Sequence, residues 1–504
     1  MLTICQKLKM NNDIIQNIGH ELTYHADEPL IFNSGIFLFL FLGFTFIYML
    51  LQRKLTARLL FVTAFSYYFY YKSSGTYFFL LAIVTIVDFF LAKAIYLQRN
   101  HQRKKLVMVT ASLVVNIGLL AYFKYTNFFA GMVATMIGSN FQPWDIFLPV
   151  GISFFTFQSM SYTIDVYRGR LKPLKSLLDY AFYVSFFPQL VAGPIVRATD
   201  FVPQIRRPLT ITRYMFAQGV YFIVIGLFKK AVISDYISLN FVDRIFDNPN
   251  LYSGLENLLG VYGYALQIYC DFSGYSDMAI GIALLLGFHF PLNFNAPYSS
   301  ISITDFWRRW HISLSTWIRD YIYISLGGNR KGKVRQYVNL FITMLIGGLW
   351  HGASLNFVAW GGMHGLALAA HKFFSCNILK HPRHYAGSGW RRVAAMVLTF
   401  HFVCFAWIFF RNSTFSGSWQ MINRIVTNFH PELLSQVLLG YKYVFLLMAF
   451  GYVSHFLPQK WHNWFVERIK GGNILTDALL ITVVIYVVIQ VKSSEIQPFI
   501  YFRF

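Results

Sequence analysis

The sequence is poor in charged residues. Only 13% of its 504 residues are Asp, Glu, Lys or Arg, whereas 56% are hydrophobic. A soluble domain carries about 25% charged and about 45–50% apolar residues, so this composition excludes a soluble globular protein. It indicates a polytopic membrane protein, in which the abundant Phe and Tyr suit lipid contact and interfacial belts.

Cysteine and acidic residues are also scarce. Cys5, Cys270, Cys376 and Cys404 show no C-x-x-C spacing, which argues against a disulfide framework and against a metal site. The 21 Asp and Glu are outnumbered by 43 Lys and Arg, giving a net charge of +22. Because the basic residues lie in short loops between apolar runs, the positive-inside bias and anionic lipid headgroups explain them better than nucleic acid does.

Long apolar runs dominate the rest of the chain. A spanning helix needs about 20 such residues. Candidate spans lie at 35–51, 57–71, 77–97, 106–129, 146–166, 214–234, 354–374, 392–410, 443–457 and 475–491, with shorter or broken runs at 178–195, 256–289 and 337–350. We expect an all-α polytopic membrane protein with about 11–13 transmembrane or re-entrant helices. Residues 30–504 form one domain in this interpretation, and residues 1–29 form a polar N-terminal extension that does not resemble a signal peptide.

Loop charges predict that the basic loops are cytoplasmic and that the N-terminus lies outside. The run 178–195 breaks this alternation because both of its flanks are basic. It contains Pro188, Gly193 and Pro194, which interrupt helices, and we interpret it as re-entrant. Irregular backbone at membrane depth must be covered by protein or by a water-filled cavity, so a cavity inside the bundle is expected.

The run 256–289 is interrupted by C-D-F-S-G-Y-S-D, which places Asp271, Ser273, Tyr275 and Asp277 among apolar residues. One interpretation is a helix kink whose polar groups satisfy each other and the freed backbone. The other is a polar wall of the cavity. The sequence leaves both open.

His311 lies in a segment with helical periodicity. Over 302–324 one aromatic stripe recurs at spacings of three and four: Trp307, Trp310, Leu314, Trp317 and Tyr321. The pattern predicts one amphipathic helix capped by Thr304, with Asp305 paired to Arg309. Too rich in Arg to span, this helix should lie at the membrane boundary or dip into the cavity. His311 is then either a site residue or an interfacial histidine paired with a carboxylate.

His351 follows a short apolar run. The 14 residues of 337–350 would reach about 21 Å, short of a hydrocarbon core of about 30 Å. The chain then turns at G-G-L-W-H-G-A and returns through 354–374, which predicts that His351 lies deep in the bilayer as an uncharged proton acceptor. The alternative is a histidine bonded to a backbone carbonyl. His364, in W-G-G-M-H-G, is a second candidate base but fits a structural neighbour better.

Several longer motifs occur in a fixed order. They are F-L-P-V-G-I-S-F-F-T-F-Q-S-M-S-Y from Phe147, F-F-P-Q-L-V-A-G-P-I-V-R from Phe186, D-F-S-G-Y-S-D-M-A-I-G from Asp271, N-F-N-A-P-Y from Asn293, D-F-W-R-R-W-H-I-S-L-S-T-W-I-R-D-Y from Asp305, G-G-L-W-H-G-A from Gly347 and the terminal P-F-I-Y-F-R-F. In sequence and order they resemble the membrane-bound O-acyltransferase (MBOAT) family, in particular its bacterial alginate O-acetylation branch.

This resemblance implies a ring of tilted helices around a funnel with a buried tunnel, and a catalytic core at about residues 147–374. It implies an O-acyltransferase of the bacterial cytoplasmic membrane that moves an acyl group, with acetyl expected, towards the hydroxyls of an exported polysaccharide. Acetyl-CoA or an acyl-carrier thioester would be the donor substrate, with no bound cofactor. An acyltransferase outside the membrane would be the partner that completes the transfer.

The resemblance also implies that His351 is the principal catalytic residue and His311 the second family histidine. O-acylation needs a base for the hydroxyl proton, donors for the tetrahedral oxyanion and exclusion of water. We assign the base role to His351, and we expect His311 to position the acyl group or stabilise the oxyanion. Trp310 and Trp350, which precede the histidines, are expected to support the cavity. No nucleophile is evidently activated, so direct transfer and an acyl-enzyme both stay open.

The basic segment 290–336 is a candidate contact for the donor phosphates, through Arg308, Arg309 and Arg319. Membrane topology alone is the competing explanation of these charges. Three other functions also remain: D-alanyl transfer to teichoic acid-like polymers, acylation of a protein or lipid, and a transporter or export channel without chemistry. Broken helices and midplane polar groups also mark transporters, but the sequence shows no inverted repeat.

Overall fold

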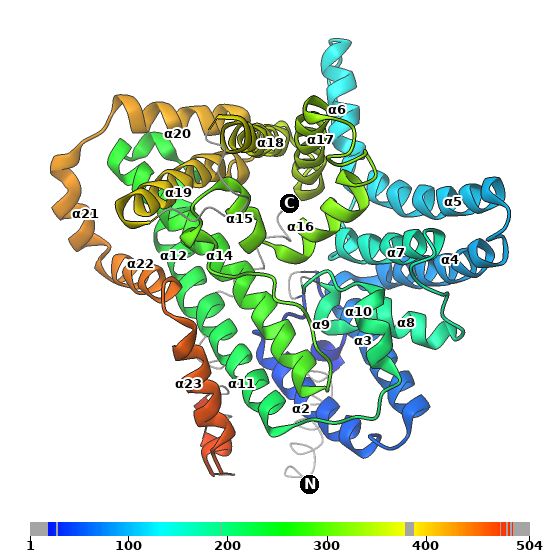
Figure 1. Cartoon of the computed structure of the whole chain (residues 1–504). Helices are drawn as coiled ribbons and strands as arrows, with labels where there is room; N and C mark the ends of the chain where they lie inside the picture. Colours follow the sequence, from blue (N-terminus) through cyan, green and yellow to red (C-terminus); the bar gives the residue numbers. More distant parts are fainter. Residues whose placement is uncertain are drawn as a thin grey trace, which may run out of the picture.

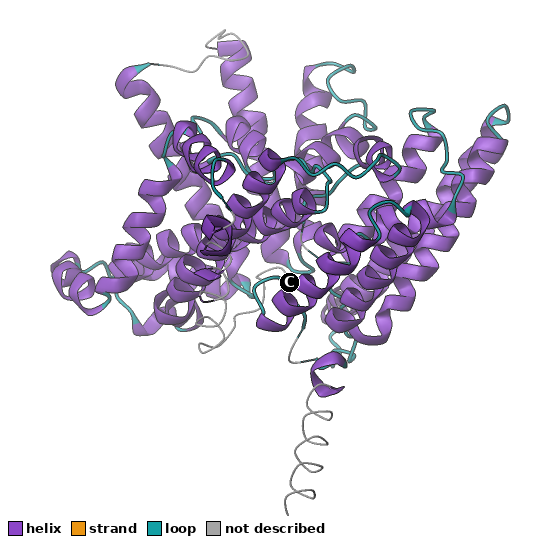
Figure 2. Cartoon of the chain, turned by 90° about the horizontal axis from the view of Figure 1, so that it is seen from below, coloured by secondary structure: helices purple, strands orange, loops and turns teal. Residues whose placement is uncertain are grey.

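The computed structural model describes residues 19–26, 29–191, 193–378, 388–473, 475–479, 482, 483 and 486. Within these residues every regular element is a helix, which confirms the all-α prediction (Figure 2). Most of the predicted extension 1–29, most of the predicted span 475–491 and the whole terminal motif P-F-I-Y-F-R-F lie outside the described residues.

The first third of the chain forms long apolar helices that begin and end close to the predicted spans. They are α2 (Gly35–Leu50), α3 (Leu55–Ser74), α4 (Phe78–Leu97), α5 (Gln102–Leu120), α6 (Thr126–Met136) and α7 (Ile152–Tyr167). A π-helical turn, η2 (Ala121–Tyr125), joins α5 to α6. Figure 1 shows α4, α5 and α7 side by side on one flank of the molecule, with α6 rising beyond it.

The predicted re-entrant run 178–195 forms short helices that are enclosed by protein. It forms α8 (Leu177–Ser185) and α9 (Phe187–Leu190), and α10 (Ala198–Ile205) follows. Phe187 and Leu190 are fully buried. The chain from α8 to α10 therefore satisfies the requirement that irregular backbone be covered by protein. Its position in the membrane stays a prediction.

The middle of the chain holds the longest helix. α11 (Arg213–Leu227), η3 (Phe228–Ser234), α12 (Asp235–Ile237), η4 (Ser238–Val242) and α13 (Asp243–Asp247) lead to α14 (Gly254–Leu285). α14 is continuous over 32 residues, so the predicted kink around Asp271 is wrong. Glycine serves close packing here, because a Cβ at Gly274 would lie only 2.7 Å from the carbonyl oxygen of Gly226 in α11.

The predicted single helix over 302–324 is also wrong. The chain instead forms α15 (Ile303–Arg309), α16 (Ile312–Ile318) and η7 (Arg319–Tyr323), and it breaks at His311, which has a φ of 43°. The N-cap is Ser302, whose hydroxyl accepts from the Asp305 backbone N–H, rather than Thr304. The ion pair between Asp305 and Arg309 is confirmed, with 3.0 Å between its atoms.

The last histidine segment is a tight helical hairpin of α17 (Lys333–His351) and α18 (Leu355–Phe373). α17 has 19 residues and reaches about 28 Å, because its polar first turns are helical as well. This helix is not among those of the described chain that are long and apolar enough to span a membrane, so the short apolar run and the depth of His351 stay predictions. The glycines serve helix packing, since a Cβ at Gly361 would lie 2.5 Å from the Met344 carbonyl oxygen.

The C-terminal helices lie on the flank opposite α4 and α5, and α14, α15 and α16 lie between the two flanks (Figure 1). They are α19 (Gly389–Arg411), α20 (Phe415–Thr427), α21 (Leu434–Gly440), α22 (Lys442–His455) and α23 (Gln459–Lys470).

Four helical stretches of the described chain are long and apolar enough to span a membrane. They are Leu55–Leu97, Gln102–Met136, Arg213–Asp247 and Gly389–Arg411, and the bent pair Pro431–Gly440 and Lys442–His455 would make a fifth. Large apolar side chains such as Phe39 and Phe46 are about two-thirds exposed on α2, as expected for contact with lipid. The chain is a multi-pass membrane protein. The predicted total of crossing helices and the funnel stay predictions.

Candidate active site

His351 is the last residue of α17 and is buried. Its imidazole packs edge-on against Trp360 of α18 at 5.1 Å and against Phe410 of α19 at 5.2 Å between ring centroids. The preceding Trp350 lies 5.0 Å away. Three helices thus hold this side chain in an aromatic pocket.

His311 occupies the break between α15 and α16 and is completely buried. Its ring stands edge-on to Phe272 of α14 at 4.6 Å and lies 6.0 Å from the ring of Trp350. Trp350 therefore contacts both histidine rings. The structure brings together two segments that are 40 residues apart in sequence.

An amide, not a carboxylate, is the partner of His311 in the described chain. Its Nδ1 lies 3.1 Å from Oδ1 of Asn293. The backbones also pair, because the Ile312 N–H donates to the Asn293 carbonyl at 2.9 Å and the Asn295 N–H donates to the Arg309 carbonyl at 2.9 Å. The N-F-N-A-P-Y segment thus anchors the histidine turn.

Lys124 is a site residue that the sequence analysis missed. From the π-helical turn η2 its Nζ donates to the carbonyls of Trp350 at 2.7 Å and of His351 at 2.8 Å. The neighbouring Tyr125 hydroxyl donates to the Leu349 carbonyl. The last carbonyls of a helix lack intrahelical partners, so these side chains cap the C-terminus of α17. The sequence signal that could have identified Lys124 is its position as a lysine inside the apolar run 106–129.

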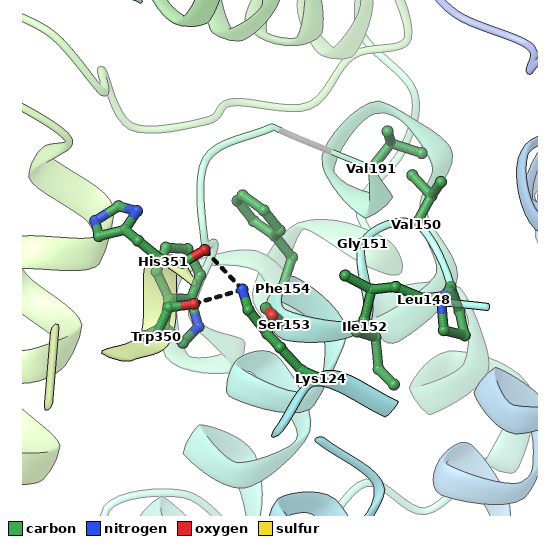
Figure 3. Close-up of a pocket in the computed structure, with 11 residues that line it drawn as sticks. Lys124, Leu148, Val150, Gly151, Ile152, Ser153, Phe154, Val191, Trp350 and His351 are labelled. Carbon is green, nitrogen blue, oxygen red and sulfur yellow. Dashed lines mark hydrogen bonds between the residues drawn. The ribbon is translucent and has the colours of Figure 1, made fainter. Parts of the chain in front are cut away.

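Lys124 also borders a small cavity of about 40 Å³. The start of α7 and the loop before it, residues 148–154, form most of the remaining wall. In Figure 3 the Lys124 side chain reaches the two carbonyl oxygens, whereas the imidazole of His351 points away from the cavity. The cavity therefore contacts the backbone that positions His351 and not its imidazole ring.

We expect Lys124→Met to lower the activity of the protein about tenfold or more, because two carbonyls would lose their donor and the turn carrying His351 would relax. Leaving a buried acceptor unsatisfied costs about 1–3 kcal/mol. Activity and thermal unfolding of the purified protein measure the two effects. Lys124→Arg retains a donor and should retain more activity, and equal activity of wild type and Lys124→Met would contradict this role.

The predicted carboxylates of α14 pair with lysines rather than with each other. Asp271 contacts Lys230 of η3 at 2.6 Å, and Lys230 also contacts Asp235 at 2.7 Å. Asp277 contacts Lys229 at 2.8 Å. These charges are satisfied between α14 and η3, which explains why α14 needs no kink.

The other supporting candidates are buried at various distances from the histidines. Ser273 and Tyr275 lie within α14, and Tyr275 stacks on Phe32 at 4.6 Å. Trp310 is buried with its ring 5.0 Å from Trp407. It therefore belongs to the aromatic packing behind the histidine turn.

His364 is a neighbour of the site through Trp360, which contacts both His364 at 4.7 Å and His351. Its Nδ1 accepts a hydrogen bond from the Trp307 indole N–H at 3.3 Å. His364 therefore links α18 to α15.

The three arginine candidates differ in their surroundings. Arg308 is exposed, whereas Arg309 is half-buried in its pair with Asp305. Arg319 contacts Asp320 at 2.7 Å. Partial burial alone would raise the pKa of the Asp320 carboxyl, but hydrogen bonds from Arg319 and Arg197 hold that pKa below its usual value. Of the three, Arg308 is the side chain most available to an anion.

Comparison with known proteins identifies the family. Residues 107–415 match the model of MBOAT, the membrane-bound O-acyltransferase family, and this range includes both histidines. The chain is 39% identical over 443 residues to a probable alginate O-acetylase of Pseudomonas aeruginosa, covering 86% of this chain and 82% of the relative.

The names of two further relatives state different functions. A peptidoglycan O-acetyltransferase of Helicobacter pylori is 37% identical over 428 residues, covering 79% of this chain and 80% of the relative. A teichoic acid D-alanyltransferase of Bacillus subtilis is 31% identical over 284 residues, covering 54% of this chain and 71% of the relative. The chain therefore belongs to the membrane-bound O-acyltransferase family and is a multi-pass membrane O-acyltransferase.

Proposed function

We propose that this O-acyltransferase moves an acetyl group from a cytosolic thioester towards the hydroxyls of an exported polysaccharide, across the bacterial cytoplasmic membrane. The observation that carries the proposal is the meeting of His311 and His351 around Trp350 in a buried aromatic pocket. Two relatives that each cover more than three quarters of this chain, an alginate O-acetylase and a peptidoglycan O-acetyltransferase, support acetyl transfer to a polysaccharide.

His351 is the base in this proposal. It takes the proton of the attacking hydroxyl as the oxygen bonds to the thioester carbonyl carbon. The carbon–sulfur bond then breaks, and the leaving thiolate receives the proton. The aromatic surroundings of both histidines keep water away, which limits hydrolysis of the thioester.

Acetyl-CoA fits the donor role because it is an anionic thioester. Its phosphates would meet the exposed Arg308, and Arg309 and Arg319 are further candidates in the same basic segment. We further propose that an acyltransferase partner outside the membrane completes the transfer onto the polymer.

D-alanyl transfer to a teichoic acid-like polymer is the second candidate. The similarity to the Bacillus subtilis D-alanyltransferase supports it. That similarity covers 54% of this chain, whereas the alginate O-acetylase similarity covers 86%, so acetyl transfer is favoured.

The test compares a strain lacking this protein with the same strain complemented by it. Cell-surface polymers are analysed for O-acetyl esters, for D-alanyl esters and for the amount exported. Restored O-acetyl with constant export supports the proposal. Restored D-alanyl ester alone would replace acetyl by D-alanyl, and a change in export with constant acylation would indicate a transporter.

A further inference from the structure

The side-chain oxygen of Asn293 collects three donors at the His311 turn. Oδ1 lies 3.2 Å from the backbone nitrogen of Ser313, 2.9 Å from its hydroxyl and 3.1 Å from Nδ1 of His311. Asn293 is itself buried.

The orientation of the Asn293 amide follows from groups that can only donate. A backbone N–H has no acceptor role, so the atom facing the Ser313 nitrogen must be the amide oxygen. The amide nitrogen in turn lies 3.2 Å from the Ser276 hydroxyl oxygen of α14, which can accept. Swapping the two amide atoms would place an NH₂ group against an N–H, which disfavours the swapped form.

The Ser313 hydroxyl is oriented in the same way. Its oxygen accepts from the Ile195 backbone N–H at 3.0 Å, so its own hydrogen is available to Asn293. Both groups of Ser313 therefore donate to the Asn293 oxygen. The third contact of this oxygen must also be a donor, and that donor is Nδ1 of His311.

A neutral imidazole with hydrogen on Nδ1 carries an unshared pair on Nε2. Nε2 of His311 is buried and has no hydrogen-bond partner among the described residues. It lies in a ring whose neighbours are Phe272 and Trp350, which offer little stabilisation to a charged imidazolium. An unsatisfied buried acceptor at such a place requires an explanation, and a ligand O–H supplies one.

We propose that Asn293 is a positioning residue that holds His311 in the Nδ1–H tautomer, so that Nε2 accepts a hydrogen bond from a second hydroxyl of the acceptor molecule, beside the one that is acylated. The identity of that molecule rests on the proposed function. In this tautomer Nε2 has no hydrogen to donate, so His311 orients the acceptor molecule and does not stabilise the oxyanion. His351 remains the group that takes the proton.

The backbone of His311 is in the left-handed region. A φ of 43° is rare for a residue with a side chain and is sustained only where the surroundings impose it. Here the Ile312 N–H is bonded to the Asn293 carbonyl, so one residue holds both the backbone and the ring of the histidine turn.

His364 shows the opposite arrangement. The Trp307 indole N–H can only donate, so Nδ1 of His364 is an acceptor and the hydrogen of its neutral ring lies on Nε2. His311 and His364 are therefore distinguishable by tautomer, and His364 provides an internal reference for a spectroscopic test.

The first test measures the tautomer without any substrate. ¹⁵N NMR of the purified full-length protein, labelled at histidine, separates protonated from unprotonated ring nitrogens, and His311→Asn identifies the His311 signals. We expect a protonated Nδ1 and an unprotonated Nε2 in the wild type. A protonated Nε2 on neutral His311 would overturn the proposal whatever reaction the protein catalyses.

The second test uses variants of Asn293 with a control in the same loop. Asn293→Leu removes the acceptor and should shift His311 towards the Nε2–H form, with acyl transfer reduced about 10- to 100-fold, as for other residues that orient a functional histidine. Asn293→Asp keeps an oxygen opposite Nδ1 and should keep the tautomer and more of the activity. Leu292→Ala changes an exposed residue of the same loop and should match the wild type.

The outcomes separate this inference from the proposed function. Normal acyl transfer in Asn293→Leu despite a changed tautomer would overturn the positioning role. Equal losses in Asn293→Asp and Asn293→Leu, with the tautomer unchanged in both, would also overturn it. If the wild type transfers no acyl group but shows the Nδ1–H tautomer, the proposed function fails and the assigned hydrogen bond stands.

Discussion

His351→Ala is expected to abolish acyl modification while the polymer is still exported. A positioned general base contributes about 10²- to 10⁴-fold to such a reaction, and His351 is the base in the proposed function. The backbone should tolerate the change, because the carbonyl of residue 351 and not its ring accepts from Lys124. The measurement is the acyl content of the surface polymer at matched protein levels in the membrane.

His289→Ala is the matched control. His289 is exposed, in the loop between α14 and α15, and its substitution should leave acylation unchanged. Acyl content equal to the wild type in His351→Ala would refute the base assignment. Lost export with normal acylation would instead favour a transport function.

Lys230→Met is expected to destabilise the protein strongly. Lys230 is buried and lies between Asp235 and Asp271, at 2.7 and 2.6 Å. Removing one partner of a buried ion pair costs about 3–5 kcal/mol, because the remaining charge stays buried without compensation. A large fall in the unfolding temperature of the detergent-solubilised protein, or its loss from the membrane, is the expected result.

An exposed pair provides the control for this experiment. Lys470 contacts Glu467 at 2.9 Å on the surface of α23, and Lys470→Met should change stability by no more than about 1 kcal/mol. Adding Asp271→Leu to Lys230→Met should recover part of the stability, since one uncompensated carboxylate is then absent. Unfolding of Lys230→Met at the wild-type temperature would show that this cluster contributes little.

Local sequence patterns predicted some helices correctly and others incorrectly. The apolar runs at 35–51, 57–71 and 77–97 became helices with nearly the predicted bounds, because long apolar stretches have few alternatives in a membrane. The aromatic stripe of 302–324 persists through two helices that are broken at His311. Periodicity records which side chains face the core, and it does not reveal a single left-handed residue imposed by Asn293.

Contacts between distant segments also explain why the polar cluster at Asp271 and Asp277 was misinterpreted. Asp271 and Asp277 interrupt an apolar run, which suggested a kink or a cavity wall. Their partners, Lys230 and Lys229, lie 41 and 48 residues earlier in a π-helical segment, and no local pattern connects the pairs. Once paired, the carboxylates fit within an unbroken α14.

The sequence alone determined the class of the molecule and its candidate histidines. Composition and long apolar runs dictate a helical membrane protein, since a chain with so few charges cannot remain soluble. The ordered motifs point to His311 and His351. Only the tertiary structure decided that Trp350 brings these two rings together, that Lys124 caps the helix ending at His351, and that Asn293 selects the tautomer of His311. These are contacts between distant segments, and their geometry exists only after the helices have packed.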